Sequence, residues 1–183
     1  VKMPPFIVTL ATMMIYRSIA QYYLRSLVRK SIYNMEGTLS SYEPFYNLGQ
    51  YRVFGVIPLV GIILVIVGII MVFLTTSTKY GWTIYAVGSN ERAALLAGIN
   101  VDWVRVSVYM ITGALCGLSA FVWLAMNGAV DPATLGRSNE MYAIAAVVIG
   151  GVSMSGGKGK LLGVLFGALS YNIIDKIIAS MGF

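Results

Sequence analysis

Long uncharged apolar runs divide the chain into segments of membrane-spanning length. The two longest stretches without a charged residue are 53–78 and 106–130. A helix needs about 20 apolar residues to cross the hydrocarbon layer of a bilayer. The pattern therefore predicts transmembrane helices over residues 55–76 and 106–126.

Three further segments are apolar but interrupted: 5–23, 141–157 and 161–183. The first contains Arg17, which must either extend to an interface or face protein rather than lipid. The second is short and ends in glycines and serines, which is typical of a broken helix whose loosened end is buried in protein. The third can span only if Asp175 and Lys176 lie near an interface or line a cavity. We predict a single all-α domain over residues 1–183, a polytopic membrane bundle with about five membrane segments.

Two polar connections separate the predicted spans. Residues 24–54 are rich in Tyr and Phe, which favour the headgroup level, so an interfacial loop without specific chemistry is the simplest interpretation. If the segments alternate across the membrane, basic residues divide six to five between the sides, with 79–105 on the richer side. The positive-inside rule then predicts, by a narrow margin, a cytoplasmic 79–105 loop and an extracytoplasmic 24–54 loop.

The 79–105 loop contains the stretch AVGSNERAALLAGIN, which has the pattern of a short capped helix. Asn90 is a good N-cap, Glu91 places negative charge in the first turn, and Gly98 permits a left-handed stop. About two turns of helix are marginal alone in water. Its small apolar side chains are Ala93, Ala94, Leu96 and Ala97. The helix is either a surface connector or a rigid element that docks into a soluble subunit, with Glu91 and Arg92 as rim contacts.

Glycines at steps of four predict two close helix contacts. GKLLGVLFG places Gly159, Gly163 and Gly167 on one helix face, and GALCG places Gly113 and Gly117 likewise. Such spacing lets another backbone approach closely. Packing within the subunit is favoured over a dimer seam.

Composition supports membrane insertion and argues against catalysis. Of 183 residues, 58% are hydrophobic and 11% charged, with a net charge of +6. The basic residues are scattered among apolar runs, which favours membrane faces over a nucleic-acid groove. Cys116 is the only cysteine, and we expect it to be a small buried residue without a disulfide partner. The sequence contains no histidine, so no imidazole metal site is expected. No acid, base and nucleophile set indicates an enzyme.

Several polar or aromatic residues in or near the spans are candidates for a substrate pathway. They are Gln21, Asn127, Glu140, Tyr171 and Asn172. Each is able to contact substrate hydroxyls, and each is also a candidate for an interhelical hydrogen bond or an interface anchor.

Four ordered blocks resemble the permease subunit of bacterial monosaccharide importers of the ATP-binding cassette class, of the ribose, xylose, arabinose and galactose type. The blocks are PPFIVTLATMMIYRSIA, YGWTIYAVGSNERAALLAGIN, YAIAAVVIGGVSMSGGKGK and LLGVLFGAL. The resemblance implies a multi-pass protein of the bacterial inner membrane that pairs with a second permease, identical or different. It also implies a cytoplasmic ATP-binding subunit and an extracytoplasmic sugar-binding protein as partners. The permease itself then needs no cofactor, because the partner subunit uses the ATP.

In that family, the loop matching residues 88–100 carries a coupling helix that seats in the ATPase. The residues that fall on the family pattern are Gly88, Asn90, Ala93, Ala94, Gly98 and Ile99. Glu140 also matches a family glutamate, whereas Tyr142 stands where the family often has an acid, and residues 22–51 fit poorly. The chain is expected to be a fragment, lacking spans before Val1 and one after Phe183.

Other interpretations remain open from sequence. Within the family, the solute could be another small polar molecule such as a nucleoside. The broken segment at 150–157, together with Arg17, Asp175 and Lys176, is also compatible with an ion-coupled secondary transporter or a channel. Co-purification of an ATPase separates an ATP-driven importer from these alternatives. The sequence does not identify the particular sugar.

Overall fold

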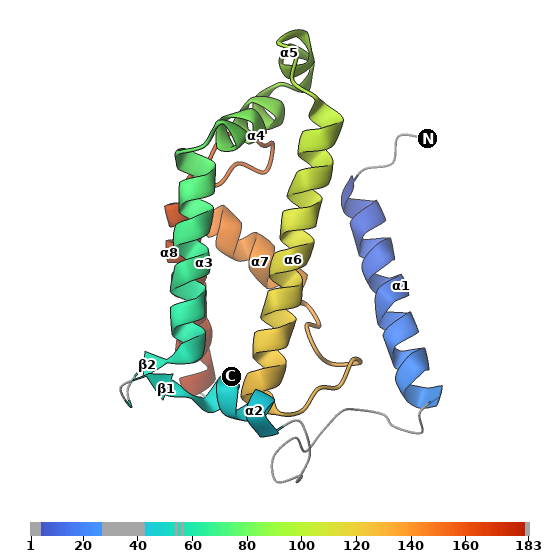
Figure 1. The fold of residues 1–183 in the computed structure, drawn as a ribbon, viewed down its shortest axis with the longest axis vertical. Helices are drawn as coiled ribbons and strands as arrows, with labels where there is room; N and C mark the ends of the chain where they lie inside the picture. The colour runs from blue at the N-terminus through green and yellow to red at the C-terminus, as the bar shows by residue number, and fades with distance from the viewer. Residues whose placement is uncertain (1–4, 27–42, 54, 56, 182–183) are drawn as a thin grey trace. The chain divides into compact units, whose positions relative to one another are not determined.

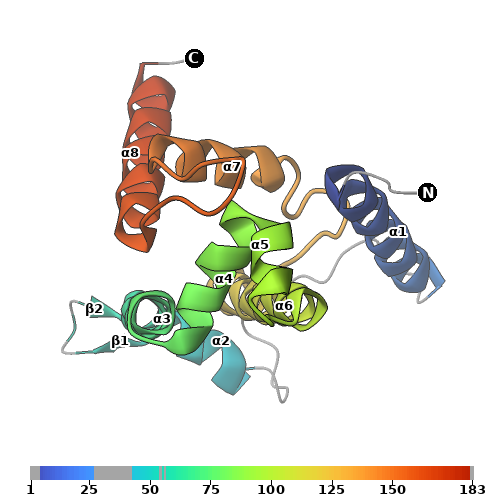
Figure 2. The same ribbon diagram turned by 90° about the horizontal axis from the view of Figure 1, so that it is seen from above.

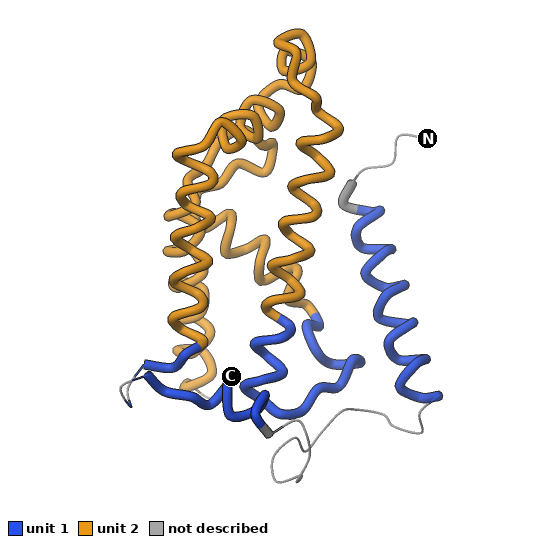
Figure 3. The backbone as a smooth tube through the Cα atoms, viewed as in Figure 1, with its two compact units in different colours: residues 1–59, 120–137 blue, residues 60–119, 138–183 orange. Residues whose placement is uncertain are grey.

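The computed structural model describes residues 5–26, 43–53, 55 and 57–181. The described elements are α1 (Pro5–Ser26), α2 (Glu43–Gln50), β1 (Arg52–Val53), β2 (Ile57–Pro58), α3 (Leu59–Thr76), α4 (Lys79–Ser89), α5 (Glu91–Leu96), α6 (Val101–Asn127), α7 (Asn139–Ile149) and α8 (Leu161–Ser180). They form two compact units, residues 1–59 with 120–137 and residues 60–119 with 138–183 (Figure 3). The helical class predicted from the sequence is confirmed.

In the first unit, α2 and β1 occupy part of the predicted 24–54 loop and β2 follows it, while residues 27–42 lie outside the described ranges. Gly49 of α2 is buried because its backbone packs directly on the carbonyl of Ala125 in α6. The Gln50 side-chain amide donates to the Met126 carbonyl at 2.9 Å. A short amphipathic helix therefore covers the end of α6.

Arg17, the charge inside α1, contacts protein. Its guanidinium is half-buried and donates to the Leu135 carbonyl at 3.4 Å within the same unit. The second of the two alternatives for Arg17 is thus the one observed, since a buried guanidinium requires acceptors for its N–H groups.

Three described helices are long and apolar enough to cross a membrane: α3, α6 and α8. Their large apolar side chains point outward, as Leu64 of α3 shows with 68% of its surface exposed. Such continuous apolar exposure is typical of a surface that faces lipid. The protein is therefore a multi-pass membrane protein.

The predicted count of about five spans is not confirmed. The helix α1 is 22 residues long, but Arg17, Gln21, tyrosines and threonines interrupt its apolar positions. The helix α7 has 11 residues, and at about 1.5 Å per residue it covers roughly half of the hydrocarbon layer. The expected short helix at 141–157 is therefore present, but it does not span.

Two helix boundaries differ from the predicted ones for local reasons. The helix α3 begins at Leu59 rather than at residue 55, because Ile57–Pro58 pairs with Arg52–Val53 in an antiparallel ladder. The helix α6 begins at Val101 rather than at residue 106, because the Asn100 side chain accepts a hydrogen bond from the Trp103 amide at 3.0 Å. This cap starts the helix within the polar loop.

The helices α7 and α8 form a packed helical hairpin in the second unit, and their ribbons cross one another in Figure 2. A Cβ atom added at Gly163 would overlap the carbonyl of Gly150, and one at Gly167 would overlap the carbonyl of Ala146. Four residues farther from the loop on each helix, the ring centroids of Tyr142 and Tyr171 lie 5.4 Å apart. The hairpin is thus closed by small residues near its loop and by an aromatic pair farther out.

The other predicted packing glycines behave differently. Gly159 is not on the face of α8, because it precedes the helix with a φ of 148° that a helix does not allow. Gly113 and Gly117 lie on α6 with no described atom within 4 Å of an added Cβ. Cys116, expected to be buried, is exposed between them. This face of α6 is therefore unoccupied in the described part of the chain.

Candidate functional site

The residues from Thr78 to Arg105 form a corner that connects the ends of α3 and α6 in the second unit (Figure 1). We call it the 78–105 corner. The Thr78 hydroxyl donates to the Leu74 carbonyl at 2.6 Å and accepts from the Gly81 amide at 3.2 Å. Gly81 is buried because its backbone packs on the carbonyl of Thr75. The chain therefore turns sharply out of α3 with its polar groups satisfied.

The predicted short helix is present as α5, and both of its ends are capped as the sequence indicates. The Asn90 side chain accepts from the Ala93 amide at 3.1 Å. At the other end, Gly98 has a φ of 79° and donates to the Leu95 carbonyl, while the Ile99 amide donates to the Ala94 carbonyl, both at 3.0 Å. This is a Schellman motif. Capping stabilises a six-residue helix that is too short to persist alone.

Three small aliphatic residues of α5 and α6 are buried. Ala94 is 4% exposed, and Val101 and Val104 of α6 are 3% and 6% exposed. Nearby, the Tyr80 hydroxyl of α4 lies 2.6 Å from the Ser107 hydroxyl of α6. This hydrogen bond joins α4 to the start of α6, and the burial of Ala94, Val101 and Val104 shows that α5 and the start of α6 pack against protein on one side.

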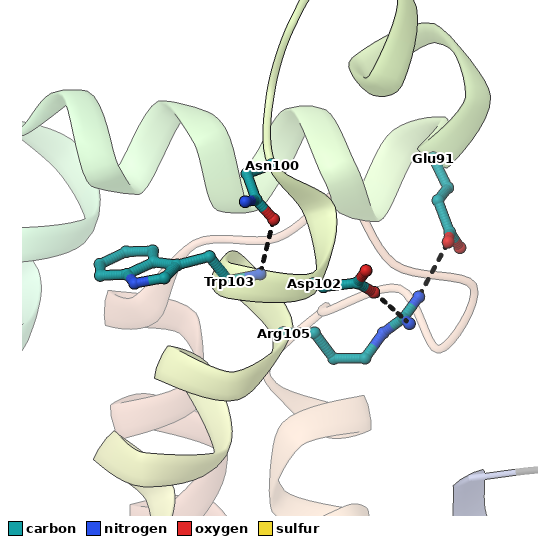
Figure 4. Close-up of polar contacts among 5 residues, drawn as sticks. All are labelled: Glu91, Asn100, Asp102, Trp103 and Arg105. Carbon is teal, nitrogen blue, oxygen red and sulfur yellow. Dashed lines mark hydrogen bonds and ion pairs between the residues drawn. The ribbon is translucent and has the colours of Figure 1, made fainter.

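Arg105 adds a polar clamp on the outside of the corner (Figure 4). Its guanidinium lies 2.9 Å from the carboxylate of Glu91 in α5 and 3.6 Å from that of Asp102 in α6. The Arg105 and Glu91 side chains are each about half exposed. An ion pair this exposed contributes less than about 1 kcal/mol, so it orients α5 rather than holding it.

The predicted coupling residues divide between an outer and an inner set. Outward-facing members are Glu91, Arg92, Ala93, Leu96 and Gly98, together with Leu95, which the sequence analysis missed. Leu96 is 91% exposed. Ala94 instead points into the corner, Ile99 is half-buried, and Asn90 serves as the cap. Gly88 packs on Gly157 of the loop between α7 and α8.

The outer face of α5 exposes two large apolar side chains, Leu95 and Leu96, while its inner side is packed and capped. A helix of six residues cannot bury Leu95 and Leu96 by itself, and apolar side chains this exposed indicate a contact surface. Charged groups at Glu91 and Arg92 flank them, which is the composition of an interface rim. The corner is therefore suited to docking, not to chemistry.

The predicted pathway residues are divided between the two units. Gln21 and Asn127 belong to the first unit, and Glu140, Tyr171 and Asn172 belong to the second. The side-chain amides of Asn127 and Asn172 donate to carbonyls of their own helices, Trp123 and Ala168, at 2.9 and 2.8 Å. These bonds lie within a helix rather than between helices.

Two of these residues have neighbours that the sequence analysis did not anticipate. Gln21 lines a pocket of about 240 Å³ with Arg25 and Asp131. Tyr171 faces Tyr142 across the α7–α8 hairpin. The register of the glycine contacts is the signal that predicts this pair, because residues 150 and 163, 146 and 167, and 142 and 171 follow one antiparallel alignment. Within the described ranges, no cluster of His, Cys, Asp and Glu could hold a metal ion.

Comparison with known proteins gives a consistent result over the whole chain. Residues 1–183 match the family described as the branched-chain amino acid transport system / permease component. The chain is 36% identical over 181 residues to the ribose import permease protein of Bacillus subtilis (strain 168), covering 99% of this chain and 53% of that protein. No solved structure matches.

Two further relatives carry the names of other sugars. The D-allose transport system permease protein of Escherichia coli (strain K12) is 38% identical over 172 residues, which is 94% of this chain and 49% of that protein. The fructose import permease protein of Rhizobium meliloti is 31% identical over 189 residues, covering 99% of this chain and 49% of that protein. The chain thus spans about half the length of the curated relatives it matches.

Proposed function

The chain belongs to the branched-chain amino acid transport system / permease component family, and on that premise we propose that it is part of the membrane-spanning subunit of an ATP-driven sugar importer. A permease family is one of transport subunits and not of enzymes, in agreement with the lack of a catalytic set. In the proposal, a separate subunit hydrolyses ATP, and the permease moves a monosaccharide into the cytoplasm.

The observation that carries the proposal is the geometry of α5. It is a capped helix that buries Ala94 beneath it and presents Leu96, 91% exposed, above it. A membrane-surface connector would not need a rigid tip joined through caps to two helices of spanning length. A docking element would, because a force applied to α5 must move α3 and α6 rather than bend a loop.

In the proposal, the permease works by alternating access. ATP binding draws the partner subunits together and displaces α5, and the attached helices then pivot to open a sugar-sized path to one side or the other. A bound nucleotide shifts such an equilibrium only through contacts that differ between its two states. The outer face of α5 supplies those contacts in the proposal.

The remaining assignments follow from the same premise. The 78–105 corner faces the cytoplasm of a bacterial cell, and the 24–54 segment faces the outside of the inner membrane. A second permease, identical or different, and an extracytoplasmic sugar-binding protein complete the assembly. The pathway candidates Gln21, Asn127, Glu140, Tyr171 and Asn172 keep that role within the proposal.

A monosaccharide is the favoured substrate because the relatives cited above are named for ribose, allose and fructose. The description of the family instead refers to branched-chain amino acids, and a nucleoside is a third class. The three classes differ in hydroxyl content and charge, so competition separates them.

Uptake into proteoliposomes tests the proposal. The native transporter is reconstituted with its ATP-binding subunit and its binding protein, and uptake is measured with labelled ribose in the presence of unlabelled allose, fructose, leucine or uridine. We expect that uptake of labelled ribose requires ATP. We also expect that unlabelled allose or fructose reduces this uptake and that leucine and uridine do not. Competition by leucine or uridine only would overturn the sugar assignment, and uptake driven by an ion gradient without ATP would overturn the importer itself.

A further inference from the structure

The end of α4 is in direct backbone contact with the loop that joins α7 to α8. A Cβ atom added at Gly88 would lie 2.8 Å from the amide nitrogen of Gly157. One added at Gly157 would lie 2.5 Å from the Cα of Ser89. No side chain separates the two backbones. A movement of one backbone therefore displaces the other directly, because no side-chain rotamer change is available to absorb it.

A side-chain hydrogen bond reinforces this contact. The Tyr85 hydroxyl of α4 donates to the Gly159 carbonyl at 3.0 Å. Tyr85 lies one helical turn before Gly88, so α4 touches the loop at two successive turns. The two contacts border a pocket of about 330 Å³ between α4 and the loop.

The loop is itself tied to the hairpin it connects. The Ser153 amide donates to the Lys158 carbonyl at 2.9 Å, and the Gly156 amide donates to the Ser153 carbonyl at 3.1 Å. Directly beyond the loop, Gly150 of the α7 end and Gly163 of α8 are in close contact. A displacement of residues 153–160 is therefore passed to α7 and α8 together.

On the other side, α4 is continuous with α5. Asn90 ends α4 through its amide, which donates to the Ala86 carbonyl at 3.1 Å, and begins α5 through its side chain. Only one residue separates the two helices. A push on α5 thus reaches Ser89 and Gly88 of α4 before it reaches the α7–α8 hairpin.

We propose that the Gly88–Gly157 contact is the link through which movement of α5 is transmitted to the α7–α8 hairpin, with Gly88 and Tyr85 as positioning residues. The inference rests on the proposed function, because it needs a partner that moves α5. It gives Gly88 a role inside the subunit in place of a contact with the partner. It also assigns α7, which is too short to span, to the moving part.

Gly88→Ala tests the link, because Gly88 lies in α4 at a negative φ and the substitution adds only a Cβ. The matched control is Gly68→Ala in α3, where an added Cβ meets no described atom within 4 Å. Both changes replace a helical glycine with alanine, so their effects on helix propensity are the same. In proteoliposomes, we expect Gly88→Ala to lower the number of sugars imported per ATP hydrolysed by about threefold or more, and Gly68→Ala to leave that ratio unchanged.

A second readout separates transmission from a merely structural role. Hydrogen exchange of residues 91–96 and 153–160 is compared with and without a non-hydrolysable ATP analogue in the assembled transporter. In the wild type, we expect both segments to respond to the nucleotide, and in Gly88→Ala only residues 91–96 to respond. An equal response of residues 153–160 in the variant, or a sugar-to-ATP ratio equal to that of Gly68→Ala, overturns the inference.

Two further results make the test decisive. If Gly88→Ala does not assemble, Tyr85→Phe removes only the hydroxyl that bonds Gly159, and Tyr109→Phe is its control because the Tyr109 hydroxyl makes no described hydrogen bond. We expect Tyr85→Phe to lower the sugar-to-ATP ratio, by less than Gly88→Ala does, and Tyr109→Phe to leave it unchanged. Equal ratios for the two tyrosine variants contradict the link.

If no ATP-binding subunit co-purifies with the wild type, the proposed function fails, whereas normal assembly with an unaffected ratio rejects the link alone.

Discussion

Replacing Ala93 with Arg is expected to reduce ATP-dependent uptake at least tenfold while the permease still folds. Ala93 is exposed on α5, and Arg is a good helix former, so the helix itself tolerates the change. At the centre of a docking surface, however, a long charged side chain keeps the partner from closing on Leu95 and Leu96. Losses of about 2 kcal/mol or more are usual for a central interface position, which corresponds to at least a tenfold effect. Uptake and binding-protein-stimulated ATP hydrolysis measure it.

Two companion variants show whether the outer face of α5 is responsible. Ala93→Ser is small and is expected to retain uptake. Ala94→Arg places the same charge on the buried side of α5, where Ala94 is 4% exposed, and is expected to lower the yield of folded protein instead. Normal uptake and normal ATP hydrolysis with Ala93→Arg would mean that α5 does not dock as proposed.

Gly167→Val in α8 is expected to destabilise the permease strongly. An added Cβ at Gly167 would overlap the Ala146 carbonyl and lie 2.7 Å from the Gly150 amide nitrogen. The hairpin must then open along its length, and forcing extra atoms into a packed contact costs about 1–3 kcal/mol. Thermal unfolding of the purified permease in detergent measures the loss.

The control for this change is Gly68→Val on α3, where the space beside the glycine is open in the described structure. Both variants place a β-branched residue in a helix, so the local cost is matched. We expect a clearly lower melting temperature for Gly167→Val than for Gly68→Val. Equal melting temperatures would show that the α7–α8 contact does not contribute to stability.

Local sequence signals predicted α5 well, because its structure depends on neighbouring residues. Asn90 and Gly98 are caps whose hydrogen bonds reach five residues or fewer, and both lie where the sequence placed them. The direction of Ala94 was not predictable, since a helix of six residues is too short for periodicity to reveal its buried face. Burial of Ala94 depends on tertiary packing, which the local sequence does not specify.

Two predictions failed, one on the glycine pattern before α8 and one on the helix α4. The four-residue glycine steps include Gly159, but the helix begins only at Leu161, because the loop bonds from Ser153 to Lys158 hold the preceding chain in a turn. The helix α4 was missed because its aromatic sequence, KYGWTIYAVGS, has no polar face that marks a surface helix. Its position depends on the Thr78 cap and on tertiary contacts such as Tyr80 with Ser107.

Contacts of different strength act within the corner and between the corner and the rest of the second unit. Arg105 connects α5 to α6 through ion pairs that are half exposed and are screened by salt. Gly88 connects α4 to residues 153–160 through backbone contact, which salt does not weaken. Movement of α5 should therefore be passed to the α7–α8 hairpin at any ionic strength.

Cross-linking from Leu96→Cys, with Cys116 replaced by Ser, tests the central claim that the outer face of α5 contacts an ATP-binding subunit. Leu96 is 91% exposed, so a cysteine there is accessible to a short bifunctional reagent in inverted membrane vesicles. The account predicts a cross-linked product that contains the ATP-binding subunit and that diminishes when Ala93→Arg is added. A cysteine that reacts only from the extracytoplasmic side, or that never joins the ATP-binding subunit in a transporter that imports sugar, would contradict it.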